Sequence, residues 1–225
     1  MRPSGKWRRL PAERWLPAPP DPSTLVPAVL VWRAGTALVR CHRSTYGATE
    51  LNTRSDVSQR FRPFAAGGRT VPTLSGSELL AGALSETLFH DVPVTGPARR
   101  IRISRLLEWL GSTIAPRRDL RLADLRDASL GALGLTREHL IESPALAYPE
   151  TAEWARALFH SPAAADGLVW NARQRREKLA MILFGRGRVA RSDLEVVEPP
   201  LPLAIGRGLE LVLEAAERAG ITIVE

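Results

Sequence analysis

Short apolar runs separated by turn-rich stretches constrain the fold of this 225-residue chain more than any other feature. Residues 28–33 are apolar up to Trp32 and include two β-branched valines. Residues 71–74, 167–170 and 180–184 are short, mainly apolar runs typical of strands. Helical patterns stand between and after these runs without a regular strand–helix–strand repeat. The sequence therefore predicts a single compact α+β domain.

Three segments carry the signals of helices. In 78–91, apolar and neutral residues recur on one side, and a proline two residues later ends the pattern. In 203–219, Leu, Val and Ala form a stripe that stops at Gly220. A shorter helix is expected over 151–159, with its first residue, a threonine, as N-cap. Further short strands are expected at the start of 99–110, in 120–125 and in 221–224.

The first 27 residues differ in composition from the rest of the chain. They are rich in proline, arginine and tryptophan, and the run from Pro17 to Pro22 cannot form a helix interior. We expect residues 1–27 to form an extended arm, with Trp7 and Trp15 packed on a domain that spans 28–225.

The charge of the chain narrows the classes of partner. The formal net charge is +7, and a basic surface attracts nucleotides, nucleic acid or an acidic protein. The sequence has no aromatic-interleaved basic repeat, no RNA-recognition signature and no zinc-finger spacing, so direct nucleic-acid binding is the less favoured interpretation.

The single cysteine and the N-terminal residues indicate a compartment. Cys41 has no partner for an intrachain disulfide, which is typical of a reducing cytosol. The first residues lack the apolar core of a signal peptide, and no apolar run approaches the roughly 18 residues of a membrane span. We expect a cytoplasmic protein with no membrane association.

Arg60 and Glu86 are a plausible pair for binding a phosphate-bearing nucleotide. A guanidinium binds phosphate as a planar fork, and a carboxylate can orient a ribose hydroxyl or stabilise a developing cation.

Metal binding is not predicted. Cys41 and His42 have no second ligand pair at useful spacing, and Glu86 and His90, four residues apart, are typical of a pair on a helix surface.

Four short blocks in a fixed order resemble the RES-domain family, which is named for its Arg, Glu and Ser. The blocks are Val31-Trp32-Arg33; Gln59-Arg60-Phe61-Arg62-Pro63; the segments 71–77 and 82–93; and the segment 166–174 followed by 182–185. The resemblance runs from about Ala28 to Leu194.

The resemblance implies a fold similar to that of ADP-ribosyltransferase toxins. It also implies a toxin that binds NAD and cleaves its nicotinamide–ribose bond, either degrading NAD or transferring ADP-ribose. The implied partner is an antitoxin with a helix-turn-helix DNA-binding domain of the Xre type, which blocks the active site. In this scheme Glu86 stabilises the oxocarbenium-like transition state, and Arg33 and Arg60 hold the phosphates of NAD.

Two positions depart from the family pattern. Ser75 stands where the family has a tyrosine, and Ala172 stands where it has a serine. Ser75 supplies only a hydroxyl, whereas Asn171 is a candidate for the missing polar group and Tyr46 for the missing stacking surface.

These departures leave alternatives open. The chain can be an active toxin, a RES-fold protein with weakened chemistry that binds nucleotide or a partner without turnover, or a basic nucleic-acid-associated protein. The ADP-ribose acceptor, the identity of the antitoxin and the formation of a homo-oligomer are not decided by these residues.

Overall fold

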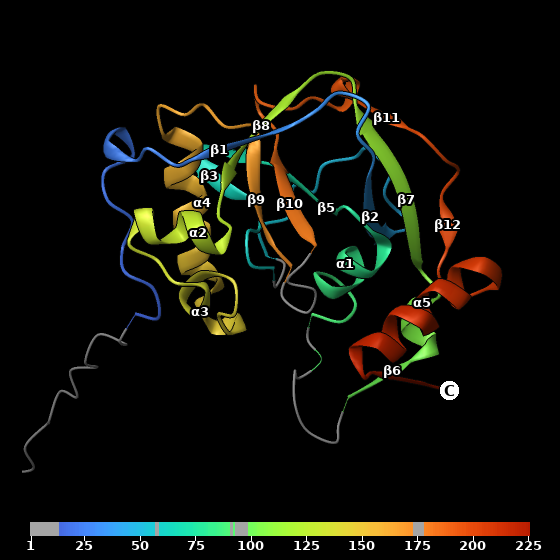
Figure 1. Ribbon diagram of the computed structural model, residues 1–225. Coiled ribbons are helices and arrows are strands. Elements are labelled where there is room, and N and C mark those ends of the chain that lie inside the picture. Colours follow the sequence, from blue (N-terminus) through green and yellow to red (C-terminus); the bar gives the residue numbers. More distant parts are fainter. Residues whose placement is uncertain (1–13, 57–58, 91, 93–98, 173–177) are drawn as a thin grey trace, which may run out of the picture.

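A curled mixed sheet forms the centre of the protein in the computed structural model, which describes residues 14–56, 59–90, 92, 99–172 and 178–225 (Figure 1). Within these residues the sheet has nine strands, in the order β1-β8-β9-β10-β5-β2-β7-β11, with β12 also paired to β7. Within the described part of this sheet, only β8 and β9 pair in parallel. The strands are β1 (Val29–Trp32), β2 (Leu38–Arg43), β5 (Thr73–Ser77), β7 (Trp109–Pro116), β8 (Leu120–Asp124), β9 (Gly167–Asn171), β10 (Leu179–Phe184), β11 (Leu194–Val196) and β12 (Leu201–Pro202).

Helices lie against two parts of this sheet (Figure 1). The long helix α4 stands with α2 and α3 beside the β8–β10 half, whereas α1 and α5 cover the β2–β7 half. The α-helices are α1 (Leu80–Ser85), α2 (Asp127–Leu130), α3 (Arg137–Leu140), α4 (Tyr148–His160) and α5 (Gly206–Ala219). Short 3₁₀ turns occupy Pro22–Thr24, Ile103–Leu106, Gly131–Leu133, Ala145–Ala147 and Arg191–Asp193.

Strand β10 shows how the core is divided between the two faces of the sheet. Ala180, Ile182 and Phe184 join the cluster beneath α4, and Met181 and Leu183 join a cluster on the opposite face. Because successive side chains of a strand point to opposite faces, a strand buried on both sides is apolar throughout. This is why the sequence run 180–184 is continuous and predicts a buried strand.

Two smaller sheets complete the fold. Strands β3 (Phe64–Ala66) and β4 (Arg69–Val71) form a hairpin, and β6 (Arg100–Arg102) pairs in parallel with β13 (Thr222–Val224). Helix α5 ends at Gly220, whose φ of 67° is the left-handed conformation expected at a helix C-terminus.

The described part of the N-terminal arm packs on α4. Leu16 is buried in the same apolar cluster as α4, and the carboxylate of Glu150 accepts hydrogen bonds from the backbone N–H groups of Trp15 and Leu16. The indole of Trp154 donates to the carbonyl of Pro17 at 2.9 Å. Residues 1–13, including the Trp7 expected to pack on the domain, lie outside the described residues.

The mixed α+β fold confirms the prediction, and the predicted segments 28–33, 120–125, 167–170, 180–184 and 221–224 correspond to β1, β8, β9, β10 and β13. The predicted bounds of all three helices differ from the structure, and α5 begins at Gly206 instead of residue 203. Helix α1 ends at Ser85, because Leu88 and Phe89 turn into the core beside α5 and the Phe89 N–H bonds back to the Leu84 carbonyl. The expected end of that helix, at Asp91 and the following proline, lies outside the described residues.

Helix α4 begins at Tyr148 and not at the predicted N-cap Thr151. Proline at its second position is favoured in a first helical turn, because the missing N–H would have no partner there.

Strands β2 and β7 fall in stretches that the sequence did not mark as strands. Among the described residues, no helix is long and apolar enough to cross a membrane.

Candidate functional site

A pocket lies where β2 and β5 separate. The two strands pair at Val39 and Ser77 alone, and beyond this point the ladder between them stops. The resulting pocket has a volume of about 150 Å³ and is lined by residues of both strands. Asn52 bridges to Thr73 at its far end, with a 2.7 Å bond from the Asn52 N–H to the Thr73 carbonyl. A gap in a sheet that is closed by a loop leaves backbone and side-chain polar groups facing a ligand-sized space.

Two of the residues predicted from the sequence line this pocket. Ser75 reaches it from β5, and Tyr46 reaches it from the turn after β2, where its N–H donates to the carbonyl of Arg43 at 3.0 Å. The strand divergence therefore brings together the hydroxyl at the position of the family tyrosine and a separate aromatic ring.

Arg60 and Glu86 form a buried ion pair beside the pocket. Arg60 Nη1 donates to Glu86 Oε2 at 3.0 Å, and the side chains are only 3% and 9% exposed. Their chain neighbours Gln59 and Thr87 line the pocket. The neighbouring ring of Phe61 packs edge-on against Trp170, with centroids 4.9 Å apart, which anchors this segment in the core.

Glu86 owes its position to the close approach of α1 to β5. It is the C-terminal cap residue of α1, and Gly82 in the middle of that helix lies directly over the side chain of Ser77. A Cβ at position 82 would overlap the Ser77 hydroxyl. The glycine therefore sets the distance between helix and strand, and with it the position of the carboxylate.

One edge of the Arg60 guanidinium carries no hydrogen bond. Nε and Nη2 are both buried and find no partner among the described residues. These two donors point to the same side of the planar group, away from the Nη1 that binds Glu86. Leaving a buried donor unpaired costs about 1–3 kcal/mol, and a two-oxygen acceptor such as phosphate or carboxylate would satisfy both donors at once.

Two residues in the first turns of α4, Tyr148 and Thr151, also contact Arg60. The hydroxyl of Thr151 donates to the Arg60 carbonyl, and the Tyr148 ring centroid lies 6.0 Å from the Arg60 Cζ. The Tyr148 hydroxyl is hydrogen-bonded to His90, four residues after Glu86 in the sequence. Helix α4 thus contacts both the backbone and the guanidinium of Arg60.

Arg40 is a second buried arginine at the pocket, and the sequence reasoning missed it. Its Nη1 donates to the carbonyls of Ala48 and Glu50, both at 2.8 Å, and its Nε has no partner among the described residues. Burial lowers the pKa of Arg40 to about 10, partly opposed by Cys41 and Glu50. A buried cation without a directly bound carboxylate is suited to an anionic ligand.

His42 follows Arg40 by two residues in β2 and also lines the pocket. Its Nδ1 donates to the carbonyl of Arg43 at 3.0 Å, so its Nε2 accepts from the hydroxyl of Ser112 at 2.8 Å. Burial and the nearby charge of Arg40 lower the pKa of His42 below its ordinary 6.5. His42 is therefore a neutral, fixed ring at neutral pH.

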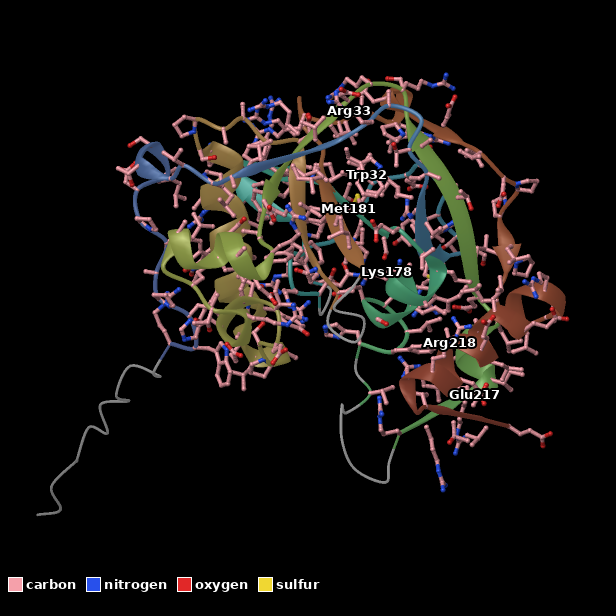
Figure 2. The ribbon with its side chains drawn as sticks, in the orientation of Figure 1. Trp32, Arg33, Lys178, Met181, Glu217 and Arg218 are labelled. Atoms are coloured by element: carbon pink, nitrogen blue, oxygen red, sulfur yellow. The ribbon has the colours of Figure 1, made fainter. Side chains whose placement is uncertain are left out.

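Arg33 does not lie at the pocket. It follows β1, which is the edge strand of the sheet and is separated from β5 by β8, β9 and β10. Its side chain is 74% exposed and forms a 2.7 Å ion pair with Asp119. Figure 2 shows Arg33 at the upper rim of the molecule.

Asn171 and Ala172 lie at the end of β9 and do not line the pocket either. Arg137 donates to both of their carbonyls, at 3.2 and 3.1 Å, and Ala172 is completely buried in the apolar cluster beneath α4. The position of the family serine is therefore a packed core position in this chain. Arg173 and Gln174, which complete that block, lie outside the described residues.

No group of three His, Cys, Asp or Glu side chains within the described ranges is arranged to hold a metal ion. Cys41 is buried, and burial raises the pKa of its thiol to about 12. The site is therefore one of arginines, a carboxylate and aromatic rings.

Comparison with known proteins identifies the family. The RES domain matches residues 31–205, which include β2, β5, α1 and both arginines of the site. The chain belongs to the RES-domain family. No curated protein matches this RES-domain chain significantly. A chain in the crystal structure of the M. tuberculosis MbcT–MbcA toxin–antitoxin complex is similar in fold, with a TM-score of 0.58 and 14% identity over 83% of this chain and 92% of that one.

Proposed function

We propose that this RES-domain protein is the toxin of a toxin–antitoxin pair and that it binds NAD and cleaves the nicotinamide–ribose bond. The observation that carries the proposal is the buried Arg60–Glu86 pair beside the β2–β5 pocket, with one guanidinium edge open. Family membership supports NAD as the substrate.

Glu86 is the proposed catalytic residue. Cleavage of the nicotinamide–ribose bond passes through an oxocarbenium-like state, in which positive charge grows on the ribose carbon as neutral nicotinamide leaves. A carboxylate fixed in a largely buried site stabilises that charge more than water does, because it is oriented before the reaction begins. The 3.0 Å bond from Arg60 supplies this orientation.

Arg60 and Arg40 are the proposed phosphate ligands. The unpaired Nε and Nη2 edge of Arg60 matches two phosphate oxygens. Arg40, whose Nε is a further unpaired donor, lines the pocket itself, whereas Arg60 lies beside it, next to the pocket residue Gln59. Arg40 thereby takes the role that the sequence suggested for Arg33. A phosphate at these groups would pair donors that are unpaired in the protein alone.

Tyr46 and Ser75 are the proposed contacts to the nicotinamide end. Both line the pocket, and Tyr46 offers the flat surface that Ser75 lacks. Asn171 lies outside the pocket lining, and the proposal gives it no contact with NAD.

An antitoxin is the proposed protein partner. The similar chain of known structure comes from a toxin–antitoxin complex, and the family resemblance implies a partner with a helix-turn-helix domain. Co-expression of the chain with the product of an adjacent gene encoding such a domain, followed by purification of a stable complex that has lost NAD cleavage, would support this part of the proposal. Separate elution of the two proteins would refute it.

The test of the activity is incubation of the purified protein with NAD and chromatographic measurement of free nicotinamide. Release of nicotinamide by the wild type supports the proposal. Ser75 and the buried Ala172 favour a second candidate, a protein that binds NAD without turnover. Calorimetric binding of NAD with no nicotinamide release would establish that candidate, and absence of both would refute the NAD proposal.

A further inference from the structure

Tyr148 lies beside Arg60 on helix α4, which carries none of the four sequence blocks that resemble the family. It is the first residue of α4 and is buried, with only 2% of its surface exposed. Its ring lies 6.0 Å from the Arg60 Cζ, within the range of a cation–π contact, and its hydroxyl is bonded to His90. Such a contact is stronger in a buried site, because neither partner is solvated by water.

Three contacts restrict Arg60, two at its guanidinium and one at its backbone carbonyl. Glu86 binds Nη1, the ring of Tyr148 lies near the group, and Thr151 fixes the backbone carbonyl. The edge that remains carries Nε and Nη2, both without partners among the described residues. An arginine side chain has many rotamers, so contacts that select one of them before a ligand arrives reduce the entropy lost on binding.

We propose that Tyr148 is a positioning residue, which holds the Arg60 guanidinium so that its open edge faces a phosphate of the ligand. The hydroxyl bond to His90 fixes the ring, and His90 belongs to the same segment as Glu86, so the ring is tied to both members of the ion pair. The proposal rests on the proposed function for the identity of NAD as the ligand. The fixed orientation of Arg60 itself does not depend on that identity.

Three substitutions separate positioning from packing. Tyr148→Leu removes the ring, and Tyr148→Phe keeps the ring and removes the hydroxyl. Phe159→Leu is the control: it removes another aromatic ring of α4, one that packs on Phe64 and Phe184 and not on Arg60. We expect Tyr148→Leu to raise the KM for NAD about tenfold, because Arg60 binds phosphate alike in ground and transition states. We expect kcat to change less than about threefold, because the bond from Arg60 Nη1 that orients Glu86 remains. Phe159→Leu should leave the KM for NAD unchanged. The KM of Tyr148→Phe should stay within about threefold of the wild-type value. Equal KM values for Tyr148→Leu and Phe159→Leu would overturn the proposal.

A spectroscopic readout tests the same inference without turnover. The buried Arg60 Nε–H should give a resolved ¹H–¹⁵N signal with slow exchange, assigned by its loss in Arg60→Lys. We expect the signal to broaden or disappear in Tyr148→Leu and to persist in Phe159→Leu. An unchanged signal in Tyr148→Leu would refute positioning. If the wild type releases no nicotinamide while this signal behaves as expected, the proposed function fails and the positioning of Arg60 stands.

Discussion

Glu86→Gln is expected to destabilise the protein strongly, because the Arg60–Glu86 ion pair is buried. The side chains are 3% and 9% exposed, and Glu86 is the only acidic partner of Arg60 among the described residues. The substitution keeps the shape of the side chain and an oxygen that accepts from Nη1, but it leaves the arginine charge uncompensated. Removing one partner of a buried pair costs about 3–5 kcal/mol. For a chain of this length, that loss lowers Tm by about 6–20 °C.

Thermal and urea unfolding followed by circular dichroism provide the measurement. Glu210→Gln is the matched control, because Glu210 forms a 3.0 Å pair with Arg207 in which both side chains are about two-thirds exposed. Such surface pairs contribute about 0–1 kcal/mol. The double variant Arg60→Met/Glu86→Leu should recover most of the stability, because no buried charge remains. A loss below about 1 kcal/mol in Glu86→Gln, or a double variant no more stable than the single one, would refute this reasoning.

Three further predictions concern the pocket and its supports. Arg40→Lys should raise the KM for NAD at least about tenfold in a steady-state assay, because the Nε donor is lost. In the same assay, the KM of Arg33→Met should stay within about twofold of the wild-type value. The lowered pKa of His42 means that the unfolded state binds the proton more readily, so unfolding free energy should fall as pH decreases through 6.5 towards the folded-state pKa. In a urea-unfolding series across these pH values, the unfolding free energy of His42→Asn should depend less on pH than that of the wild type. An identical pH dependence in the two proteins would contradict the lowered pKa of His42. Gly82→Ala should cost roughly 1–3 kcal/mol and slow NAD cleavage, because the methyl group forces α1 away from Ser77; unchanged Tm and kcat would show that the contact is not tight.

The strands that were predictable from the sequence are those buried on both faces. Strands β9 and β10 are continuous apolar runs, so their composition alone indicates burial. Strand β2 is mostly buried although it contains Arg40 and His42, so its composition, unlike that of β9 and β10, does not indicate burial. Its register with β7 pairs Leu38 with Ile114, and a contact so distant in sequence leaves no local signal.

The candidate site was predictable in part. Arg60 and Glu86 could be singled out because they stand in short blocks with a recognisable order, and the structure brings them into contact. Arg33 was selected because it stands in the first family-like block, Val31-Trp32-Arg33, although a short block does not reveal where the side chain lies relative to the pocket. Tyr148 could have been found from Pro149, which marks the first turn of α4 and so places the tyrosine at the helix start.

The measurement that tests the account most directly is the rate of nicotinamide release from NAD by the wild type, Glu86→Gln and Glu210→Gln, at a temperature where all three are folded. If Glu86 stabilises the transition state, the wild type and Glu210→Gln should release nicotinamide at equal rates, and Glu86→Gln should be slower by at least about 100-fold. Equal rates in the wild type and Glu86→Gln, or no release by the wild type at millimolar NAD, would contradict the central claim.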